Sequence, residues 1–367
     1  MLCEIEIKNK DYQNFICLEP KIIKSEKITY NKQIKEIKYR LWSFRYEFLR
    51  YYKTYIQRIK TSLNNDVSTC PFCGFEDKEK KIYYDIENKF CWGSLTYHLM
   101  KKHNYEPKNR FIQFILSLSN NKFFKVEIND LIFFDGLMNS GGRTKKFKYS
   151  LISQQQDKNK INQETKKKDY IYSEYSGYLD IQCRKKCQIE NIEVSNFRRP
   201  EPDIYMVNFY SNKLSNRQYI FHTHPPTPNA GSRIQTERIV YEFPSFDDID
   251  SFIGLKRDFR IEGEIIFAPE GLYVMISRDR KKEIPNIKFK EKREYMNILN
   301  EAYYKYLKID NEHDFYTKPA QDYKFIKDIN KLLISYNIKV LYFPRELSYD
   351  YKWIYGKIYL PINPQSR

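Results

Sequence analysis

The stretch that most constrains this chain is Phe221-His222-Thr223-His224-Pro225. Alternate residues of a β-strand project from the same face of a sheet, so an extended backbone over 219–224 aims both imidazoles at one point. Neutral imidazoles brought together in this way are common ligands of Zn²⁺. The chain has five histidines, and two of them fall in this short window. The sequence therefore predicts a strand that carries a metal-binding pair.

A helix is predicted directly after Pro244, because Ser245 is a favourable N-cap residue and an apolar run follows it. Asp248 then lies in the first helical turn, where its carboxylate is the predicted third ligand. Asp247 and Asp250 remain alternatives for that ligand. Three protein ligands leave one tetrahedral position for water, as in catalytic zinc sites. Ser245 and Asp248 are also spaced as an approximate capping box, which requires no chemistry.

The order of these residues resembles the JAMM motif of the JAB/MPN metalloproteases, in which a glutamate precedes H-x-H-P and S-x-x-D. The corresponding residues here are Glu174, the segment 222–225 and the segment 245–248. The segment 263–274 is similar to the strand-turn-strand that follows the motif helix in that family. The resemblance covers about residues 168–290. It implies an α/β (α+β) fold, with a mixed sheet flanked by helices.

The same resemblance implies hydrolysis of peptide or isopeptide bonds, with conjugates of ubiquitin-like modifiers as a substrate class. His222, His224 and Asp248 would hold a catalytic Zn²⁺, which lowers the pKa of its bound water toward about 7. By resemblance, Glu174 takes and returns the proton, and the Ser245 hydroxyl donates to the developing oxyanion. An exposed strand position without catalytic role is the alternative for Glu174.

The interval between the two halves of the motif departs from the family. Nineteen residues, 226–244, separate Pro225 from Ser245, which is longer than the family usually has. This insert suits a specificity element or a lid near the substrate groove.

A second metal site is predicted from Cys70, Cys73, His98 and His103. The spacing is C-x2-C, then 24 residues, then H-x4-H on a helical run. Two cysteines and two histidines close a tetrahedral Cys₂His₂ site without a position for water, so this zinc is predicted to be structural. The pattern resembles a C2H2 zinc finger, but the interval is longer than the usual about twelve residues, which argues against reading the DNA major groove. Cys91 is an alternative ligand or a buried thiol.

A long amphipathic helix is predicted over 32–63. Apolar side chains recur there at spacings of three and four: Ile34, Ile37, Leu41, Phe44, Phe48, Tyr51 and Tyr55. A seam of this kind packs on the core of its own chain or binds a partner in a larger assembly. Both interpretations stay open at this point.

These patterns divide the chain into six regions. They are an N-terminal region with the long amphipathic helix (1–66), a C2H2-like zinc module (67–110), a connecting helix and strands (111–152), a polar basic linker (153–168), a JAB/MPN-like domain (169–310) and a C-terminal extension (311–367). The linker has few apolar residues, which is typical of a flexible segment or of a tail that binds nucleic acid. Further predicted elements are helices at 107–119, 291–308 and 325–336, and strands at 123–134, 203–210, 339–342 and 353–360.

The chain has a formal charge of +17, and its basic residues lie mainly outside the region around the H-x-H-P motif. Residues 201–250 have 4 basic and 7 acidic residues, whereas residues 141–168 have 9 basic and 2 acidic residues. A basic surface suits nucleic acid, an acidic protein or an anionic membrane. Nucleic-acid binding therefore stays open, and it would weaken steeply with salt.

Cysteine usage favours an intracellular protein. Seven cysteines, with two of them in C-x2-C, suit reduced thiols in the cytoplasm, the nucleus or a virion better than a disulfide framework. No apolar run reaches the roughly 18 residues of a membrane span, and the N-terminal residues do not resemble a signal peptide. The bias toward Lys, Asn, Ile and Tyr suits an AT-rich genome, as in the large DNA viruses that also carry this family.

Three functional hypotheses follow from the sequence. The first is a zinc metallopeptidase or isopeptidase of the JAMM type. The alternative is a catalytically silent JAB-fold scaffold within a larger assembly or viral particle, which the long helix and the separate zinc module suit. A nucleic-acid-associated protein is the weaker third.

Overall fold

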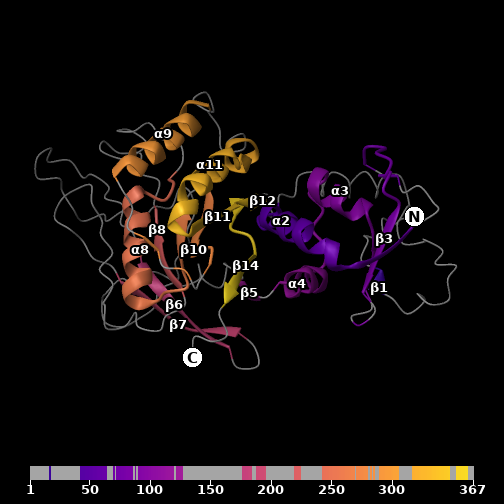
Figure 1. Cartoon of the computed structure of the whole chain (residues 1–367), viewed down its shortest axis with the longest axis horizontal. Coiled ribbons are helices and arrows are strands. Elements are labelled where there is room, and N and C mark those ends of the chain that lie inside the picture. The colour runs from indigo at the N-terminus through magenta and orange to yellow at the C-terminus, as the bar shows by residue number, and fades with distance from the viewer. Residues whose placement is uncertain are drawn as a thin grey trace, which may run out of the picture. The chain divides into compact units, whose positions relative to one another are not determined.

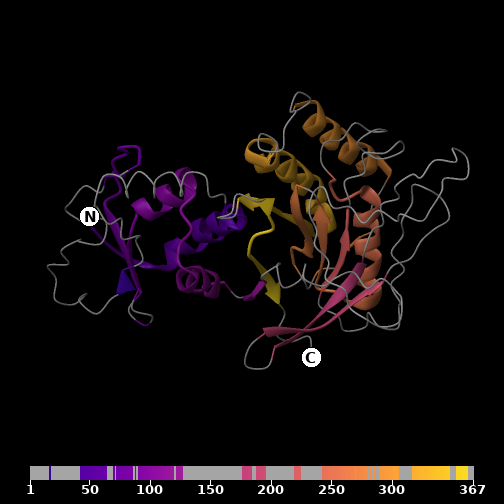
Figure 2. The ribbon, with the colours of Figure 1, turned by 180° about the vertical axis from the view of Figure 1, so that it is seen from behind.

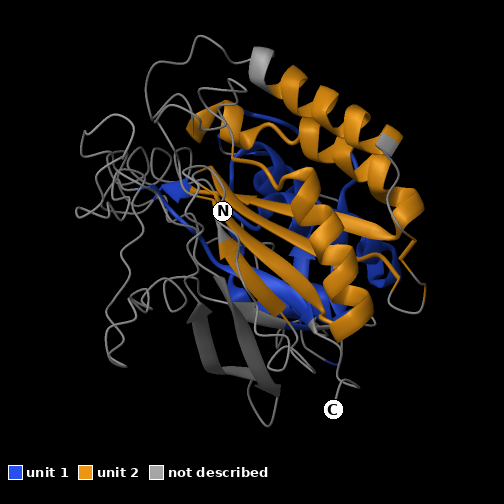
Figure 3. Ribbon diagram, turned by 90° about the vertical axis from the view of Figure 1, so that its left-hand side faces the viewer, with its two compact units in different colours: residues 1–125, 346–361 blue, residues 126–345, 362–367 orange. Residues whose placement is uncertain are grey.

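The computed structural model describes helices and strands of an α+β chain (Figures 1 and 2). The described residues are 16–17, 42–63, 69–70, 72–85, 87, 90–119, 121–126, 176–183, 187–195, 219–224, 242–268, 270–279, 282, 284–285, 289–305, 316–347 and 353–362. They belong to two compact units, which Figure 3 colours separately. Unit 1 comprises 1–125 and 346–361, and unit 2 comprises 126–345 and 362–367.

Unit 2 is built on a six-stranded mixed sheet with the order β11-β10-β9-β8-β6-β7. Its strands are β6 (Ser176–Cys183), β7 (Cys187–Ser195), β8 (Tyr219–Thr223), β9 (Gly263–Ala268), β10 (Gly271–Ser277) and β11 (Ile338–Pro344). Strands β8 and β9 pair in parallel, and the other neighbours pair antiparallel. Parallel neighbours need a crossover connection, and helix α8 (Phe246–Phe259) lies in the connection between β8 and β9. The predicted histidine pair and the predicted aspartate therefore lie on one β-α-β unit.

Helices cover one face of this sheet (Figure 3). His222, Ile266, Tyr273 and Tyr342 are consecutive register partners across β8, β9, β10 and β11, so their side chains share a face. Phe325 of α11 (Lys324–Leu332) packs on this row, with its ring 5.7 Å from that of Tyr342. Helix α9 (Phe289–Lys305) packs against both α8 and α11. The short helices η3 (Pro319–Gln321) and η4 (Leu333–Tyr336) flank α11.

Helix α8 begins and ends with well-defined caps. The Ser245 hydroxyl accepts the backbone N–H of Asp248, and the Asp248 carboxylate accepts the backbone N–H of Ser245, which is a complete capping box. At the other end, Arg260 adopts a left-handed conformation with φ of 54°. The predicted helix start after Pro244 is confirmed.

In its described residues, unit 1 combines a four-stranded sheet, ordered β1-β4-β3-β2, with the helices α2, α3 and α4. Its elements are β1 (Ile16–Cys17), α2 (Arg45–Tyr55), η2 (Ile56–Arg58), β2 (Lys60–Leu63), β3 (Lys81–Asp85), β4 (Phe90–Gly93), α3 (Leu95–Lys102) and α4 (Asn109–Ser117). Two short ladders join β5 (Lys122–Val126) to β14 (Ile358–Ile362) and β12 (Glu346–Leu347) to β13 (Trp353–Ile354). Aromatic side chains such as Phe48, Trp92 and Phe111 form its core, with ring centroids 5.0 Å apart for Trp92 and Phe111.

The prediction of one helix over 32–63 is wrong at its C-terminal end. Helix α2 ends at Tyr55, and 60–63 forms strand β2, which pairs antiparallel with β3 from Leu63↔Lys81 to Lys60↔Tyr84. The apolar seam does reach the core, because Phe44 and Phe48 are buried. The partner strand lies far along the chain, so a local pattern could not reveal it. Residues 32–41 lie outside the described part.

The C-terminal region also differs from its predicted extent. The region 311–367 was expected as one extension, but β11 is a strand of the six-stranded sheet in unit 2 and 346–361 belongs to unit 1. The strand predicted over 353–360 is two strands, β13 and β14, with Gly356 between them. At Gly356 a Cβ would collide with the side chains of Glu346 and Ser43, so these two side chains would have to shift to admit a larger residue there.

The first stretch of unit 1 ends at residue 125. The predicted linker 153–168 and the predicted strand 203–210 lie outside the described residues. Other predicted elements are confirmed: the hairpin of β9 and β10, helices α4, α9 and α11, and strand β11. Within the described residues, no helix has the length and apolar character to cross a membrane.

Candidate metal centres

His222 and His224 converge as the alternation of the strand predicts. Both imidazoles are buried, with 5% and 3% exposure, and their Nε2 atoms lie 3.0 Å apart. The backbone N–H of His224 donates to Phe267 O (2.8 Å), which extends the parallel pairing one residue beyond β8. The backbone of β9 therefore fixes both histidines.

Asp248 brings its carboxylate to the same point. Its Oδ1 lies 3.5 Å from His222 Nε2, and its Oδ2 lies 3.3 Å from His224 Nε2. Of the alternatives left open by the sequence, Asp247 is exposed and pairs with Lys292 (3.2 Å), and Asp250 is exposed. Among the described residues, the geometry therefore selects Asp248 as the third member of the cluster.

The outer nitrogens of the two imidazoles are already engaged. His222 Nδ1 lies 2.8 Å from Glu264 Oε1, and His224 Nδ1 lies 3.0 Å from the backbone oxygen of Glu242. Because both partners are acceptors, each Nδ1 carries a hydrogen, so in the neutral rings each Nε2 keeps a lone pair directed at the other. Two lone pairs and a carboxylate at this separation repel one another unless a positive charge lies between them.

The distances in this cluster suit a divalent metal ion. Ligands about 2.0–2.2 Å from zinc lie roughly 3.3–3.6 Å apart at tetrahedral angles. The His222, His224 and Asp248 ligand atoms are separated by 3.0 to 3.5 Å along the pairs given above. The donor set therefore fits a metal ion bound by two imidazoles and one carboxylate.

The electrostatics of the cluster agree with that fit. Burial lowers the pKa of His222, but hydrogen bonds and charges from Asp248 and Glu264 outweigh burial and raise this pKa well above its usual value. Burial raises the pKa of Asp248, whereas His224 and His222 lower it well below its usual value. For Glu264 the effect of burial prevails over that of His222, and the pKa is raised. The groups together favour a positive charge at their centre.

The two predicted catalytic residues differ in what the structure describes. Ser245 lies at the N-cap of α8, next to the cluster through its capping box with Asp248. Glu174 lies outside the described residues, so its predicted role stays a prediction. The insert 226–244 is likewise undescribed up to residue 241.

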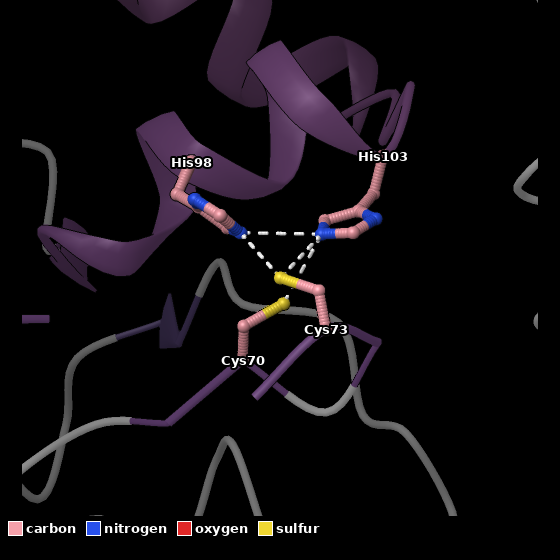
Figure 4. Close-up of side chains that lie close together, drawn as sticks. All are labelled: Cys70, Cys73, His98 and His103. Atoms are coloured by element: carbon pink, nitrogen blue, oxygen red, sulfur yellow. Dashed lines mark hydrogen bonds between the residues drawn. The ribbon is translucent and has the colours of Figure 1, made fainter. Parts of the chain in front are cut away.

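The second cluster brings together Cys70, Cys73, His98 and His103 (Figure 4). Cys70 Sγ lies 3.3 Å from His103 Nε2, and Cys73 Sγ lies 3.3 Å from both His98 Nε2 and His103 Nε2. The two Nε2 atoms are 3.2 Å apart. Four soft and borderline donors at these separations fit a closed tetrahedral metal site.

Local structure explains how these four side chains meet. Cys70 and Cys73 flank a tight turn, in which Gly74 N donates to Cys70 O (2.9 Å) and Gly74 adopts φ of 70°. A left-handed backbone conformation is costly for residues other than glycine, so Gly74 suits this turn. His98 lies on α3, and His103 is its C-cap residue.

Burial shapes the protonation of these ligands. Burial lowers the pKa of His98, and the charge of Lys102 lowers it further. Burial also lowers the pKa of His103, with added contributions from His98 and Lys102. Both rings therefore favour the neutral form that metal ligands require. Burial raises the pKa of the Cys70 thiol. Cys91, the alternative ligand, is a buried residue of β4 and is absent from the cluster of described residues.

Sequence reasoning missed Glu264 and the backbone of Glu242. Glu264 stands in the strand Gly263-Glu264-Ile265-Ile266-Phe267-Ala268, where every residue is buried. An acidic residue within an apolar strand is costly to bury unless it is partnered, and that was the available signal.

Comparison with curated proteins finds similarity to a viral protein. An uncharacterized protein of Acanthamoeba polyphaga mimivirus is 28% identical to this chain over 343 residues, which cover 83% of the chain and 91% of the relative. No family model matches the chain. No solved structure matches it.

Proposed function

We propose that this chain is a zinc-dependent hydrolase of the JAMM type that cleaves peptide or isopeptide bonds. The observation that carries the proposal is the convergence of His222, His224 and Asp248, whose ligand atoms all lie within 4.8 Å of one another. The set leaves one tetrahedral position for water, which is typical of catalytic rather than structural zinc. A JAB/MPN-like domain with a parallel β-α-β crossover at the site is part of the proposal.

In this proposal the two histidines bind through Nε2 and Asp248 binds through a carboxylate oxygen. Zinc, when bound, supplies a Lewis acid that acidifies a water molecule. The Nδ1–H groups hold both rings in the tautomer that this binding requires. The capping box fixes Asp248 on the first turn of α8, so the carboxylate needs little reordering to bind.

Ser245 and Glu174 are the proposed catalytic residues. The Ser245 oxygen accepts the Asp248 N–H, which leaves its own hydrogen available to donate to a developing oxyanion. Glu174 would take a proton from the attacking water and return it to the leaving amine. It precedes by two residues Ser176, which is the register partner of His222.

The proposal has two further parts, a structural zinc ion and a class of substrate. The Cys₂His₂ cluster holds a structural zinc, because its four protein ligands leave no position for water. The proposed substrate is an intracellular protein joined to a ubiquitin-like modifier, as the resemblance to JAMM enzymes implies.

Metal analysis and cleavage assays test the proposal together. The full chain should bind close to two zinc ions, and His224→Ala should bind one. Wild type should cleave isopeptide-linked ubiquitin-like conjugates or a peptide library in a chelator-sensitive reaction, which Glu174→Gln should abolish. Asp247→Asn, which alters an exposed carboxylate beside the site, is the matched control and should stay active. Two zinc ions without any chelator-sensitive cleavage would overturn the hydrolase and favour a zinc-binding scaffold.

A further inference from the structure

Glu264 is a buried carboxylate whose contact with the metal cluster was not expected from the sequence. It is 3% exposed and is the second residue of strand β9, in which every residue is buried. Its Oε1 lies 2.8 Å from Nδ1 of His222, the nitrogen on the far side of the ring from the cluster. An ionised side chain in such a position is costly to bury without a charged or hydrogen-bonded partner, and His222 is that partner.

The register of the sheet explains why the two side chains meet. In the parallel pairing of β8 and β9, Ile220 is the partner of Glu264 and His222 is the partner of Ile266. His222 and Glu264 therefore project from the same face, two residues apart along the strand direction. A glutamate is long enough to reach this diagonal neighbour, so the contact is set by backbone pairing rather than by a mobile loop.

Glu264 differs from a buried glutamate that is satisfied by the fold alone. Glu270 accepts the Tyr273 hydroxyl at Oε1 (2.6 Å) and the Glu242 N–H at Oε2 (3.2 Å), so both of its oxygens are used. Glu264 uses Oε1 on His222, and its Oε2 has no hydrogen-bond partner within the described part of the chain. Its hydrogen bonding is thus directed at the metal cluster.

The two histidines receive different support. His224 Nδ1 donates to a neutral backbone oxygen of Glu242, whereas His222 Nδ1 donates to a carboxylate. A carboxylate on the outer nitrogen makes the inner nitrogen a stronger donor to a metal. When it is ionised, Glu264 adds a second negative charge to that of Asp248, and two carboxylates balance the charge of a divalent ion in this buried site.

We infer that Glu264 is a positioning residue that fixes the tautomer of His222 and raises the affinity of the site for a divalent cation. This inference rests on the proposed function, because it assumes that the cluster of His222, His224 and Asp248 binds a metal ion. Glu264 acts through His222 and touches neither the substrate nor the ion.

The test compares zinc affinity among full-length variants by competition with a chelator. Glu264→Gln keeps an acceptor for Nδ1–H but removes the charge, and it should weaken binding at this site about 10-fold. Glu264→Leu removes both and should weaken binding by about 100-fold. Glu262→Gln removes another buried carboxylate, two residues earlier in the chain, and should leave the affinity unchanged.

A second readout separates positioning from a general effect on folding. With Co²⁺ in place of zinc, the visible absorption bands of the His222 site should shift in Glu264→Gln and stay unchanged in Glu262→Gln. Retention of the ion in the Cys₂His₂ site reports that each variant is folded.

The outcomes distinguish this inference from the proposed function. If wild type binds a second zinc and the affinities and Co²⁺ bands of both Glu264 variants match those of Glu262→Gln, the role of Glu264 is refuted while the metal centre stands. If wild type binds no ion outside the Cys₂His₂ site, the proposed function falls and this inference falls with it.

Discussion

Asp248 serves two purposes with one carboxylate. It accepts the Ser245 N–H as part of the capping box, and it faces both imidazoles of the cluster. The sequence permits either interpretation, capping or metal binding, and the structure shows that one side chain has the geometry for both. The helix start therefore does not compete with the metal site, because the cap holds the ligand in place.

Replacing Asp248 with asparagine should separate the two purposes. The amide oxygen can still cap α8, but the charge needed by the metal is lost. We expect Asp248→Asn to lose one of two zinc ions and all chelator-sensitive activity, with stability lowered by no more than about 1 kcal/mol. Elemental analysis and thermal unfolding measure the two effects.

Asp247→Asn is the control for this substitution. Asp247 is next in the chain but exposed, and its ion pair with Lys292 is exposed as well. Its replacement should change stability by less than about 0.5 kcal/mol and keep both zinc ions. Retention of two zinc ions by Asp248→Asn would contradict the assignment of Asp248 as a ligand.

Glu270 provides a pH-dependent contribution at the scale of one residue. Burial raises the pKa of this carboxyl above its usual value, although hydrogen bonds from Tyr273 and from the backbone oppose the shift. The folded chain therefore holds the proton more tightly than the unfolded chain. This contribution to stability is complete at pH values below the pKa that Glu270 has in the unfolded chain. It is lost as the pH rises through the higher pKa that Glu270 has in the folded chain.

The variant Glu270→Gln cannot ionise and should not show this loss. The stability of wild type minus that of Glu270→Gln should decrease as the pH rises from below the usual pKa of glutamate through the raised pKa of the folded chain. Urea unfolding of both proteins at each pH measures the difference, with metal content held equal. A difference that stays constant or grows with pH would mean that the fold does not raise the pKa of Glu270.

At the scale of elements, local patterns predicted the parts of the site that depend on neighbours in sequence. The strand of His222 and His224 follows from alternation, and the start of α8 follows from Ser245. The contact of Glu264 with His222 depends on which strand lies beside β8, and 42 residues separate the two in sequence. The same limitation explains why a helix was wrongly predicted over 60–63. These residues form strand β2 through their pairing with β3, which a local pattern does not reveal.

Close packing between β8, β9 and β10 gives the next prediction. A Cβ on Gly263 would lie 2.5 Å from Tyr219 Cε1 and 2.7 Å from the backbone oxygen of Met275. Tyr219 is fully buried and the oxygen belongs to the sheet, so neither can move away easily. Gly263→Ala should destabilise the protein by about 1–3 kcal/mol.

Gly254 is the matched control for that glycine. It lies inside α8, and a Cβ there would meet nothing within 4 Å. Gly254→Ala should therefore stabilise the protein by roughly 0.5–1 kcal/mol, because alanine loses less backbone entropy in a helix. Thermal unfolding of the two variants should shift in opposite directions, and equal shifts would contradict the packing described for β9.

At the scale of the whole molecule, the two metal clusters belong to different compact units. Cys70, Cys73, His98 and His103 lie in unit 1, whereas His222, His224 and Asp248 lie in unit 2. Each cluster draws its ligands from its own unit and is supported by its own core. A site of two imidazoles and one carboxylate with an open position suits exchange of the ion, whereas thiolates in a closed site hold zinc more firmly.

This division predicts that the two zinc ions are bound independently. Cys73→Ser should remove one zinc and leave the zinc affinity of the His222 site unchanged, and His224→Ala should do the reverse. The double variant should bind no zinc, and its loss of stability should equal the sum of the single losses within about 0.5 kcal/mol.

A mild chelator should remove the ion from the His222 site first, with loss of cleavage and little unfolding. Later removal of the proposed Cys₂His₂ zinc should unfold unit 1, because an ion bound there would join the cysteine turn to helix α3. Loss of both ions in a single step, or loss of the His222-site zinc in Cys73→Ser, would show that the two centres are coupled.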